Sequence, residues 1–315
     1  MGSFTEAPLL SPNTAIAAVM RLARAFGCAS WLIRRVLGKA ATDEAGAKVF
    51  ARYEPTEHDV FIATYSKSGT NWAMQMAQQI SHYGEAEFDH IHERVAWPEA
   101  HFSGVVALDD PGPQRDSPTG KRLIKTALRQ PLVPYSEDAT YLTVLRDPKE
   151  VFVSSYYFLF GVFDLYDSIS LEEWLDIFIA DEFPVGPWPE HAAGYWAIRD
   201  RPNVLVMPFA QLRADLGGMV RKTAQTMRVR LSDEQHAKVV ERCSFEYMRA
   251  HESKFAPPRM RFTKGQGTMV RAGKSGATDE LLSREQQARI DAHCMERLAA
   301  LGSDLPYEQL FEVVT

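Results

Sequence analysis

Cysteine is scarce in this sequence, with three residues at positions 28, 243 and 294 of 315. They are odd in number, far apart and without a CxxC pair, which argues against a disulfide framework and against a zinc site. No His/Cys cluster has the spacing of metal ligands, so no metal ion is expected. We therefore expect reduced thiols in a cytoplasmic protein.

An excess of positive charge is also missing. The chain has 35 Lys and Arg against 41 Asp and Glu, a net charge of −6. This disfavours nucleic acid as a partner but leaves small anions, which a local group of basic residues can bind. No uncharged apolar run reaches about 18 residues, and no basic region precedes an apolar core near the N-terminus. Neither a membrane span nor a secretory signal is expected.

Acidic residues are absent from one long stretch, residues 14–39, TAIAAVMRLARAFGCASWLIRRVLGK. Treated as a single helix at 100° per residue, it gathers most of its basic residues in one arc: Arg21, Arg24, Arg35 and Lys39. Such a basic amphipathic helix either packs on the domain with its arginines in water or lies in a membrane interface. Peripheral membrane contact through residues 14–39 is therefore the alternative to a purely cytoplasmic protein.

The rest of the chain alternates β-rich runs with helical patterns. This predicts an α/β fold, a single domain with a mostly parallel central sheet flanked by helices. We place an N-terminal extension at 1–50 and the main domain at 51–315. The expected strands are 59–65, 122–126, 140–146 and 203–209. The expected helices are 70–82, one from Pro148 through 158, 170–180, 188–200, 215–228, 232–250 and 283–300. Long loops are expected at about 84–120 and 251–277.

The stretch ATYSKSGTNW, residues 63–72, lies where the first strand ends. A strand that enters a Gly-containing turn and then a helix directs free backbone N–H groups at one point, where the helix dipole adds positive potential. Ser68, Gly69 and Thr70 would supply amides and hydroxyls, and Lys67 a full charge. The stretch therefore predicts a phosphate cradle. It differs from the G-x-x-x-x-G-K-[ST] pattern because Lys67 precedes its glycine, which disfavours kinases and NTPases of that type.

Two further segments offer a second set of anion ligands. VLRDPKEVFVSSYYF, 144–158, places Arg146 at the end of a strand and Ser154 two turns into the following helix. MVRAGKSG, 269–276, places Arg271, Gly273 and Lys274 in a loop. Two anionic subsites indicate a ligand with phosphates at two ends.

The three segments together resemble the signatures of the cytosolic, P-loop type of sulfotransferase that uses 3′-phosphoadenosine 5′-phosphosulfate (PAPS). The family's TYPKSGTTW corresponds to TYSKSGTNW, its RNPKDVAVSYYHF to RDPKEVFVSSYYF, and its RKGxxGDW to RAGKSGAT. The similarity extends from about residue 56 to 312, and we expect a bacterial member. By resemblance, PAPS is the co-substrate, 3′-phosphoadenosine 5′-phosphate (PAP) is the product, and no metal is needed.

The resemblance also implies roles for individual positions. Those around the 5′-phosphosulfate are Lys67, Ser68, Gly69, Thr70 and Asn71. Those around the adenine are Trp72, which matches a stacking residue, and Phe209, which stands where a tyrosine is common. Those around the 3′-phosphate are Arg146, Ser154, Arg271 and Gly273. Lys125, in IKTA, matches a lysine that faces the transferring group.

One departure bears on catalysis. The family's usual base is the histidine of KTHLP, and this chain has Ala127 there, in KTALRQP. Substitutes stand in DHIHERVAWPE, 89–99, where Glu93 and His92 are the leading candidates. Other candidates are His101 and Glu99, and the absence of any base stays open.

The sequence thus predicts an enzyme that transfers a sulfuryl group from PAPS to the hydroxyl of a small or lipid-like acceptor. The alternative is a catalytically impaired protein that binds PAPS or PAP, supported by Ala127. The smaller departures, such as Ala272 in place of a basic residue, predict weaker PAPS binding. The short C-terminal dimerisation motif of animal members is not recognisable, which leaves the oligomeric state open.

Overall fold

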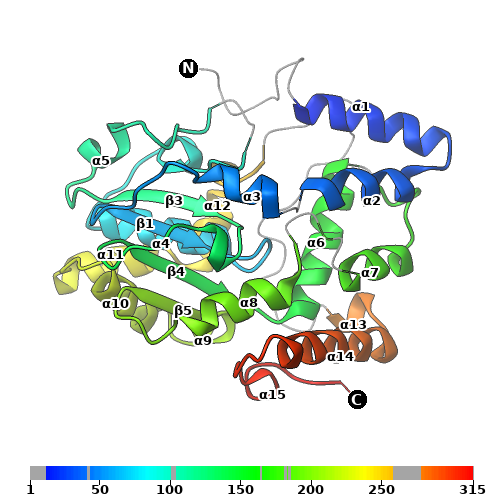
Figure 1. Cartoon of the computed structure of the whole chain (residues 1–315). Coiled ribbons are helices and arrows are strands. Elements are labelled where there is room, and N and C mark those ends of the chain that lie inside the picture. The colour runs from blue at the N-terminus through cyan, green and yellow to red at the C-terminus, as the bar shows by residue number, and fades with distance from the viewer. Residues whose placement is uncertain are drawn as a thin grey trace.

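Five parallel strands form the centre of the molecule (Figure 1). The computed structural model describes residues 12–40, 43–100, 104–163, 165–180, 183, 186–257 and 278–314. The strands are β1 (Asp59–Ala63), β2 (Val95–Ala96), β3 (Arg122–Thr126), β4 (Thr140–Leu145) and β5 (Val204–Pro208), in the order β2-β3-β1-β4-β5. Every pairing is parallel. The predicted α/β class is confirmed, and only the two-residue β2 was not anticipated.

Helices cover both faces of the sheet because its central strands are buried on both sides. All five residues of β1 are buried, and their side chains alternate between the faces. Val60 and Ile62 pack toward α4 (Thr70–Ser81), α10 (Leu216–Thr226), α11 (Asp233–Arg242) and α12 (Phe245–Ala250). Phe61 stacks on Tyr141 of β4 on the opposite face, which α3 (Asp43–Val49) and α8 (Trp188–Ala197) cover.

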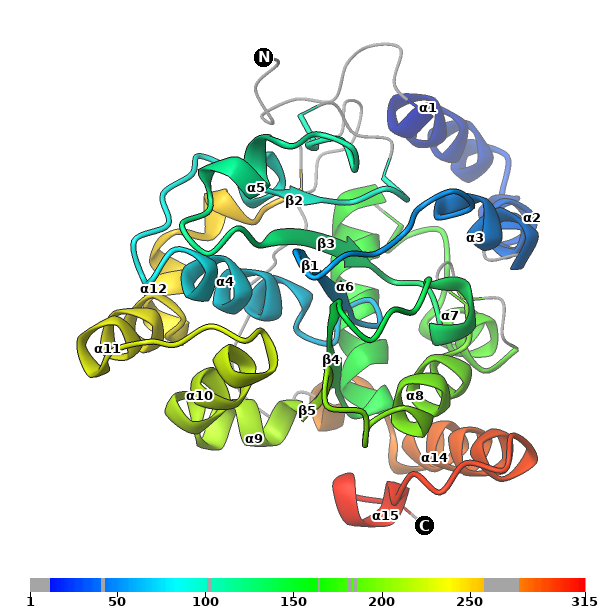
Figure 2. The same cartoon turned by 60° about the vertical axis from the view of Figure 1, so that its left-hand side comes forward.

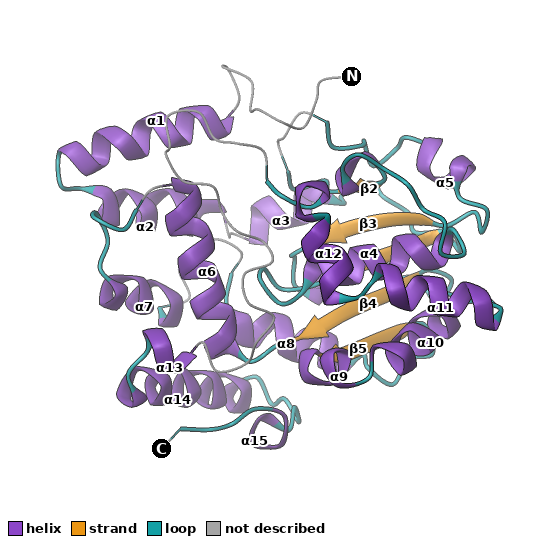
Figure 3. Ribbon diagram, turned by 180° about the vertical axis from the view of Figure 1, so that it is seen from behind, coloured by secondary structure: helices purple, strands orange, loops and turns teal. Residues whose placement is uncertain are grey.

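A helical layer lies beyond the carboxyl ends of the strands. The arrowheads of β3 and β4 point toward it in Figure 3, and Figure 2 shows it from a second side. Its members are α6 (Pro148–Phe163), α7 (Leu171–Ile179), α13 (Thr278–Leu281), α14 (Arg284–Ala300) and α15 (Tyr307–Leu310). One apolar cluster joins these helices to α1 (Pro12–Ala25) and α2 (Ala29–Ala40). The strand ends therefore face a wall of helices.

Short elements complete the described chain: α5 (Gly112–Asp116), α9 (Phe209–Ala214), and 3₁₀ turns at Ile91–Glu93, Gln130–Leu132 and Glu252–Lys254. The helix predicted over 232–250 is broken between α11 and α12, because Ser244 caps the second helix by accepting from the Tyr247 amide. None of the described helices is long and apolar enough to cross a bilayer.

The N-terminal segment differs from the expected single helix. Gly27 has a φ of 68°, and the Cys28 amide donates to the Ala23 carbonyl at 2.9 Å, a left-handed cap that ends α1. A new helix, α2, starts two residues later. Because the chain turns there, the basic residues of 14–39 do not share the single arc that one continuous helix would give them.

Candidate active site

The carboxyl ends of all five strands meet at one edge, the place where open α/β sheets bind ligands. Each strand delivers a predicted or newly found site residue there. They are Lys67 after β1, Glu99 after β2, Ala127 after β3, Arg146 after β4 and Phe209 after β5.

The turn between β1 and α4 has the backbone of an anion-binding nest. Lys67 and Gly69 both have positive φ, 66° and 104°, so the amides before α4 turn toward a common point. A Cβ on Gly69 would lie 3.2 Å from the Phe209 ring in a backbone conformation that L residues rarely adopt. The Ser68 hydroxyl is buried and has no hydrogen-bond partner among the described residues. Such a group is costly unless a ligand satisfies it, so the cradle fits an anionic group.

Two lysines converge beside the cradle. The Lys67 ammonium lies 3.8 Å from the centroid of the Phe158 ring on α6, and the Lys125 ammonium lies 3.3 Å from that of Trp97. Burial lowers the pKa of Lys67 to about 7, helped by the charges of Arg146 and Lys125. Burial likewise lowers the pKa of Lys125 to about 7, and Glu99 opposes this shift. An anion bound here would restore both charges.

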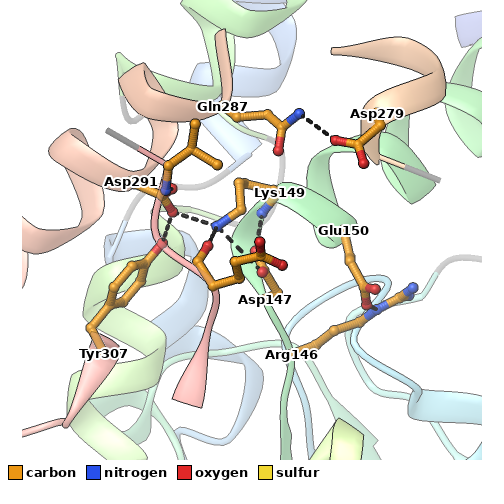
Figure 4. A network of polar contacts seen from close by, with 10 residues as sticks. Arg146, Asp147, Lys149, Glu150, Asp279, Gln287, Asp291 and Tyr307 are labelled. Atoms are coloured by element: carbon orange, nitrogen blue, oxygen red, sulfur yellow. Dashed lines mark hydrogen bonds and ion pairs between the residues drawn. The ribbon is translucent and has the colours of Figure 1, made fainter. Parts of the chain in front are cut away.

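Arg146 links the cradle to the second anion subsite. Its Nη1 donates to the Lys67 carbonyl at 2.8 Å and its Nε to Glu150 at 2.9 Å, the pair drawn in Figure 4. The guanidinium lies 4.5 Å from the centroid of the Phe209 ring. Arg146 therefore forms an ion pair and keeps its Nη2 without a hydrogen bond to the described residues. Ser154 lies on α6, the helix in which the sequence places it, and is partly exposed.

The aromatic pair expected at the adenine is assembled from two elements. Trp72 of α4 and Phe209 of α9 meet edge to face, with centroids 5.8 Å apart. The Trp72 Nε1 donates to the Cys243 carbonyl at 2.7 Å, which fixes its ring. Asn71 donates to the Phe255 carbonyl at 3.4 Å, just before residues 258–277. Arg271 and Gly273 lie outside the described residues, so their roles stay predictions.

The two leading base candidates lie in different surroundings. Glu93 is exposed at the end of the turn Ile91–Glu93, whereas His92 is buried and stacks on Trp97 with centroids 5.2 Å apart. The Nδ1 of His92 donates to the Val95 carbonyl at 3.2 Å, which leaves Nε2 as the unprotonated nitrogen. Burial and the charge of Lys125 hold the pKa of His92 well below its usual value. The structure thus brings His92, rather than Glu93, to the lysines.

Glu99 binds the backbone of Ala127, the residue at the sequence position of the family's histidine. Its Oε1 accepts from the Ala127 amide at 2.8 Å. Burial raises the pKa of Glu99 to about 7, against the opposing effects of its bonds to Ala127 and Thr126 and of Lys125. The pairing of β2 with β3 explains this contact, because Ala96 lies opposite Ile124 and both chains then run three residues further. Because β2 was not predicted, the sequence could not rank Glu99 above the other candidate bases.

A model of the sulfotransferase domain family matches residues 57–302. The chain belongs to the sulfotransferase family. Among its relatives, sulfotransferase 2A1 of Homo sapiens is 27% identical over 269 residues, which cover 83% of this chain and 92% of that protein. Luciferin sulfotransferase of Photinus pyralis is 26% identical over 266 residues, 76% of this chain and 71% of the relative.

Solved structures give the same fold. Retinol dehydratase in complex with androsterone and inactive cofactor PAP superposes with a TM-score of 0.68 at 20% identity, covering 84% of this chain and 87% of that one. Mouse sulfotransferase SULT7A1 complexed with PAP gives 0.64 at 19%, covering 86% and 94%.

The predicted enzyme class and nucleotide follow from the family: this is a PAPS-dependent sulfotransferase that transfers sulfuryl groups. The relatives named above that carry an organism are animal proteins and give no support to a bacterial source. The family match starts at residue 57, after α1, α2 and α3. The boundary at residue 50 between extension and main domain stays a prediction.

Proposed function

We propose that this sulfotransferase transfers the sulfuryl group of PAPS to the hydroxyl of a small or lipid-like acceptor, with Glu99 as the general base. The observation that carries the proposal is the buried Glu99 carboxyl, bound to the Ala127 amide and raised in pKa to about 7 next to Lys125. A general base works best with a pKa near the operating pH. Ala127 itself cannot take a proton.

The cradle is assigned to the 5′-phosphosulfate. PAPS, when bound, supplies the activated sulfuryl group, and the Gly69 and Thr70 amides, the Ser68 hydroxyl and Asn71 hold it. Sulfuryl transfer resembles phosphoryl transfer in spreading charge over peripheral oxygens, so positioned cations supply most of the catalysis. Lys67 neutralises the leaving phosphate and Lys125 faces the transferring group.

The other end of the nucleotide is assigned to the second subsite. Arg146 and Ser154 hold the 3′-phosphate, and Trp72 with Phe209 packs against the adenine. Arg271 and Gly273 complete this subsite in the proposal. The Nη2 of Arg146, which has no hydrogen bond to a described residue, supports the assignment, since a guanidinium that already holds Glu150 and the Lys67 carbonyl is fixed in orientation.

Glu99 removes the proton as the acceptor oxygen attacks sulfur. The acceptor O–H bond breaks, its proton passes to the carboxylate of Glu99, and a new O–S bond forms. The bond between sulfur and the 5′-phosphate oxygen breaks, and that oxygen leaves on PAP. His92 is the second candidate because its Nε2 is the unprotonated nitrogen, although burial beside Lys125 makes its protonation costly.

An apolar acceptor is favoured by the walls of the site. Trp97 and Phe158 lie over the two lysines, so the reacting hydroxyl would sit against aromatic rings. Retinol dehydratase, which shares the fold, is solved in complexes with androsterone and with retinol. Both are apolar molecules of the kind proposed here.

The test is acceptor-dependent formation of PAP, followed by mass, with phenols, sterols, long-chain alcohols and glycolipids. Glu99→Gln keeps an acceptor for the Ala127 amide but cannot take a proton, so kcat should fall by about 10²- to 10⁴-fold. Glu93→Gln, the same change on an exposed glutamate, is the matched control and should keep full turnover. His92→Gln separates the second candidate.

Three further outcomes decide between these interpretations. In the Glu99→Gln background, Ala127→His returns the family's imidazole and should restore part of kcat with PAP affinity unchanged. Full turnover in Glu99→Gln would show that Glu99 is not the general base and that another group serves as one. Tight PAP binding without turnover on any acceptor would favour the impaired binding protein, for which Ala127 is the supporting observation.

A further inference from the structure

The helical hairpin α1–α2 has one face packed on the domain and one face that nothing in the described chain covers. Met20, Ala23, Ala29 and Ile33 are buried in an apolar cluster that also contains residues of α6 and α7. Arg24 adds a hydrogen bond to the Ser168 hydroxyl at 2.9 Å. The hairpin is therefore held in a fixed position at an outer corner of the molecule (Figures 1 and 3).

The hairpin carries four of the six large apolar side chains that are exposed in the described chain. Phe26 at the turn is 81% exposed, Trp31 64%, Leu22 60% and Val19 47%. We call these four residues the hairpin patch. Single exposed apolar residues are ordinary, but four of them on two adjacent helices, two of them aromatic, indicate a binding surface.

The charge around the hairpin patch distinguishes between partners. The sequence from 14 to 39 holds five basic residues and no acidic one, in a chain whose net charge is −6. Arg21 and Arg35 are exposed on the same two helices. A two-fold dimer would place this surface against its own copy and bring like charges together. An anionic lipid surface complements both the arginines and the apolar side chains.

We propose that the hairpin patch docks this sulfotransferase on anionic lipid bilayers, with Phe26 and Trp31 entering the interface and Arg21 and Arg35 facing the headgroups. Aromatic side chains favour the membrane–water boundary, and an exposed turn can enter it without burying unpaired backbone over a long stretch. Phe160 of α6 belongs to the same apolar cluster as the buried face of the hairpin, and Phe158 of the same helix contacts Lys67. Docking would thus bring the part of the molecule that contains α6, a helix bordering the active site, close to lipid.

Co-sedimentation of the full chain with vesicles tests the proposal without using the enzyme's activity. We expect binding to vesicles of phosphatidylcholine mixed with phosphatidylserine, weaker binding to phosphatidylcholine alone, and a fall with added salt. The double variant Phe26→Ser/Trp31→Ser should lower the partition coefficient about tenfold or more. Leu301→Ser, which removes an apolar side chain 45% exposed at the end of α14, is the matched control and should leave binding unchanged.

A second readout places the turn itself. Cys28 is the exposed cysteine, whereas Cys243 and Cys294 are buried, so a polarity-sensitive fluorophore can be attached beside Phe26. Its emission should shift to the blue on the mixed vesicles. No binding to anionic vesicles at low salt, or an equal loss in Leu301→Ser, would overturn the proposal. So would a dimer in light scattering that the double variant dissociates while vesicles bind nothing, since the patch would then join two copies of this chain.

Discussion

Two groups of buried cations lie near the carboxyl edge of the sheet, and they have opposite surroundings. Lys149 is enclosed by acidic groups: its ammonium lies 2.5 Å from Asp291 and 3.3 Å from Asp147, and it donates to the Glu312 carbonyl at 2.8 Å (Figure 4). Asp291 also accepts from Tyr307 at 2.7 Å. Around Lys67, the charges that act on its pKa are the cations Arg146 and Lys125.

The difference separates charge used for structure from charge kept for a ligand. The Lys149 network is neutralised within the protein and ties α6 to the C-terminal helices. Lys67 and Lys125 in the active site form a local excess of positive charge. Their mutual repulsion and desolvation cost free energy, which the binding of an anion offsets. Lys67 belongs to the signature TYSKSGTNW and Lys149 to the signature RDPKEVF, so residue type and membership in a family motif do not by themselves distinguish these uses.

The largest expected effect is a loss of stability when the cation of the Lys149 network is removed. Lys149→Met leaves the carboxylates of Asp147 and Asp291 buried without their cation, which should lower the free energy of unfolding by about 3–5 kcal/mol. Chemical denaturation measures it. Lys238→Met is the control, because that ammonium pairs with Glu85 at 2.7 Å on the exposed surface and its loss should be barely measurable. Equal effects in the two variants would refute the assigned roles.

Next comes the active-site lysine. Lys67→Met should lower kcat about 10²- to 10³-fold, the range for loss of one preorganised charge-stabilising group. Stability should be kept, since the variant removes a buried charge rather than a partner. The pKa of Lys67 lies below the 10.5 of an ordinary lysine, so the unfolded state binds more protons between about 7 and 10.5 and the stability contributed by this group rises with pH there. That rise should disappear in Lys67→Met, which paired denaturation and rate measurements would reveal.

The third expected effect, the smallest when it is taken per lysine and per pH unit, is the pH dependence of nucleotide binding. Lys67 and Lys125 both have a pKa of about 7, so above that pH they must take up protons when PAP binds. Affinity should then fall by up to about tenfold per pH unit for each lysine between pH 7 and 9. Calorimetry in buffers of different ionisation enthalpy counts the protons. An affinity that stays flat across this range would show that both lysines are charged before the ligand arrives.

The sequence predicted the strand, turn and helix around Lys67, and the place of Arg146 at a strand end, because each of these patterns is local. A strand, a turn and a helix lie within a dozen residues, and their patterns are visible in one dimension. Glu99 could not be ranked in the same way, because its contact with Ala127 depends on the pairing of a two-residue strand that periodicity does not detect. The hairpin was missed for another reason: Gly27 is a helix-ending residue, and reading residues 14–39 as one helix passed over it.

The hydrogen bond from Arg146 to the Lys67 carbonyl has a consequence for nucleotide choice. With the 5′ end of the nucleotide at Lys67 and the 3′-phosphate at Arg146, as proposed, this single bond fixes the span between the two ends. The site would then select nucleotides by the distance between their anionic groups. ATP carries its phosphates at one end only, so its binding would leave Arg146 without an anion. Selection of the donor would thus lie in the backbone as much as in the side chains.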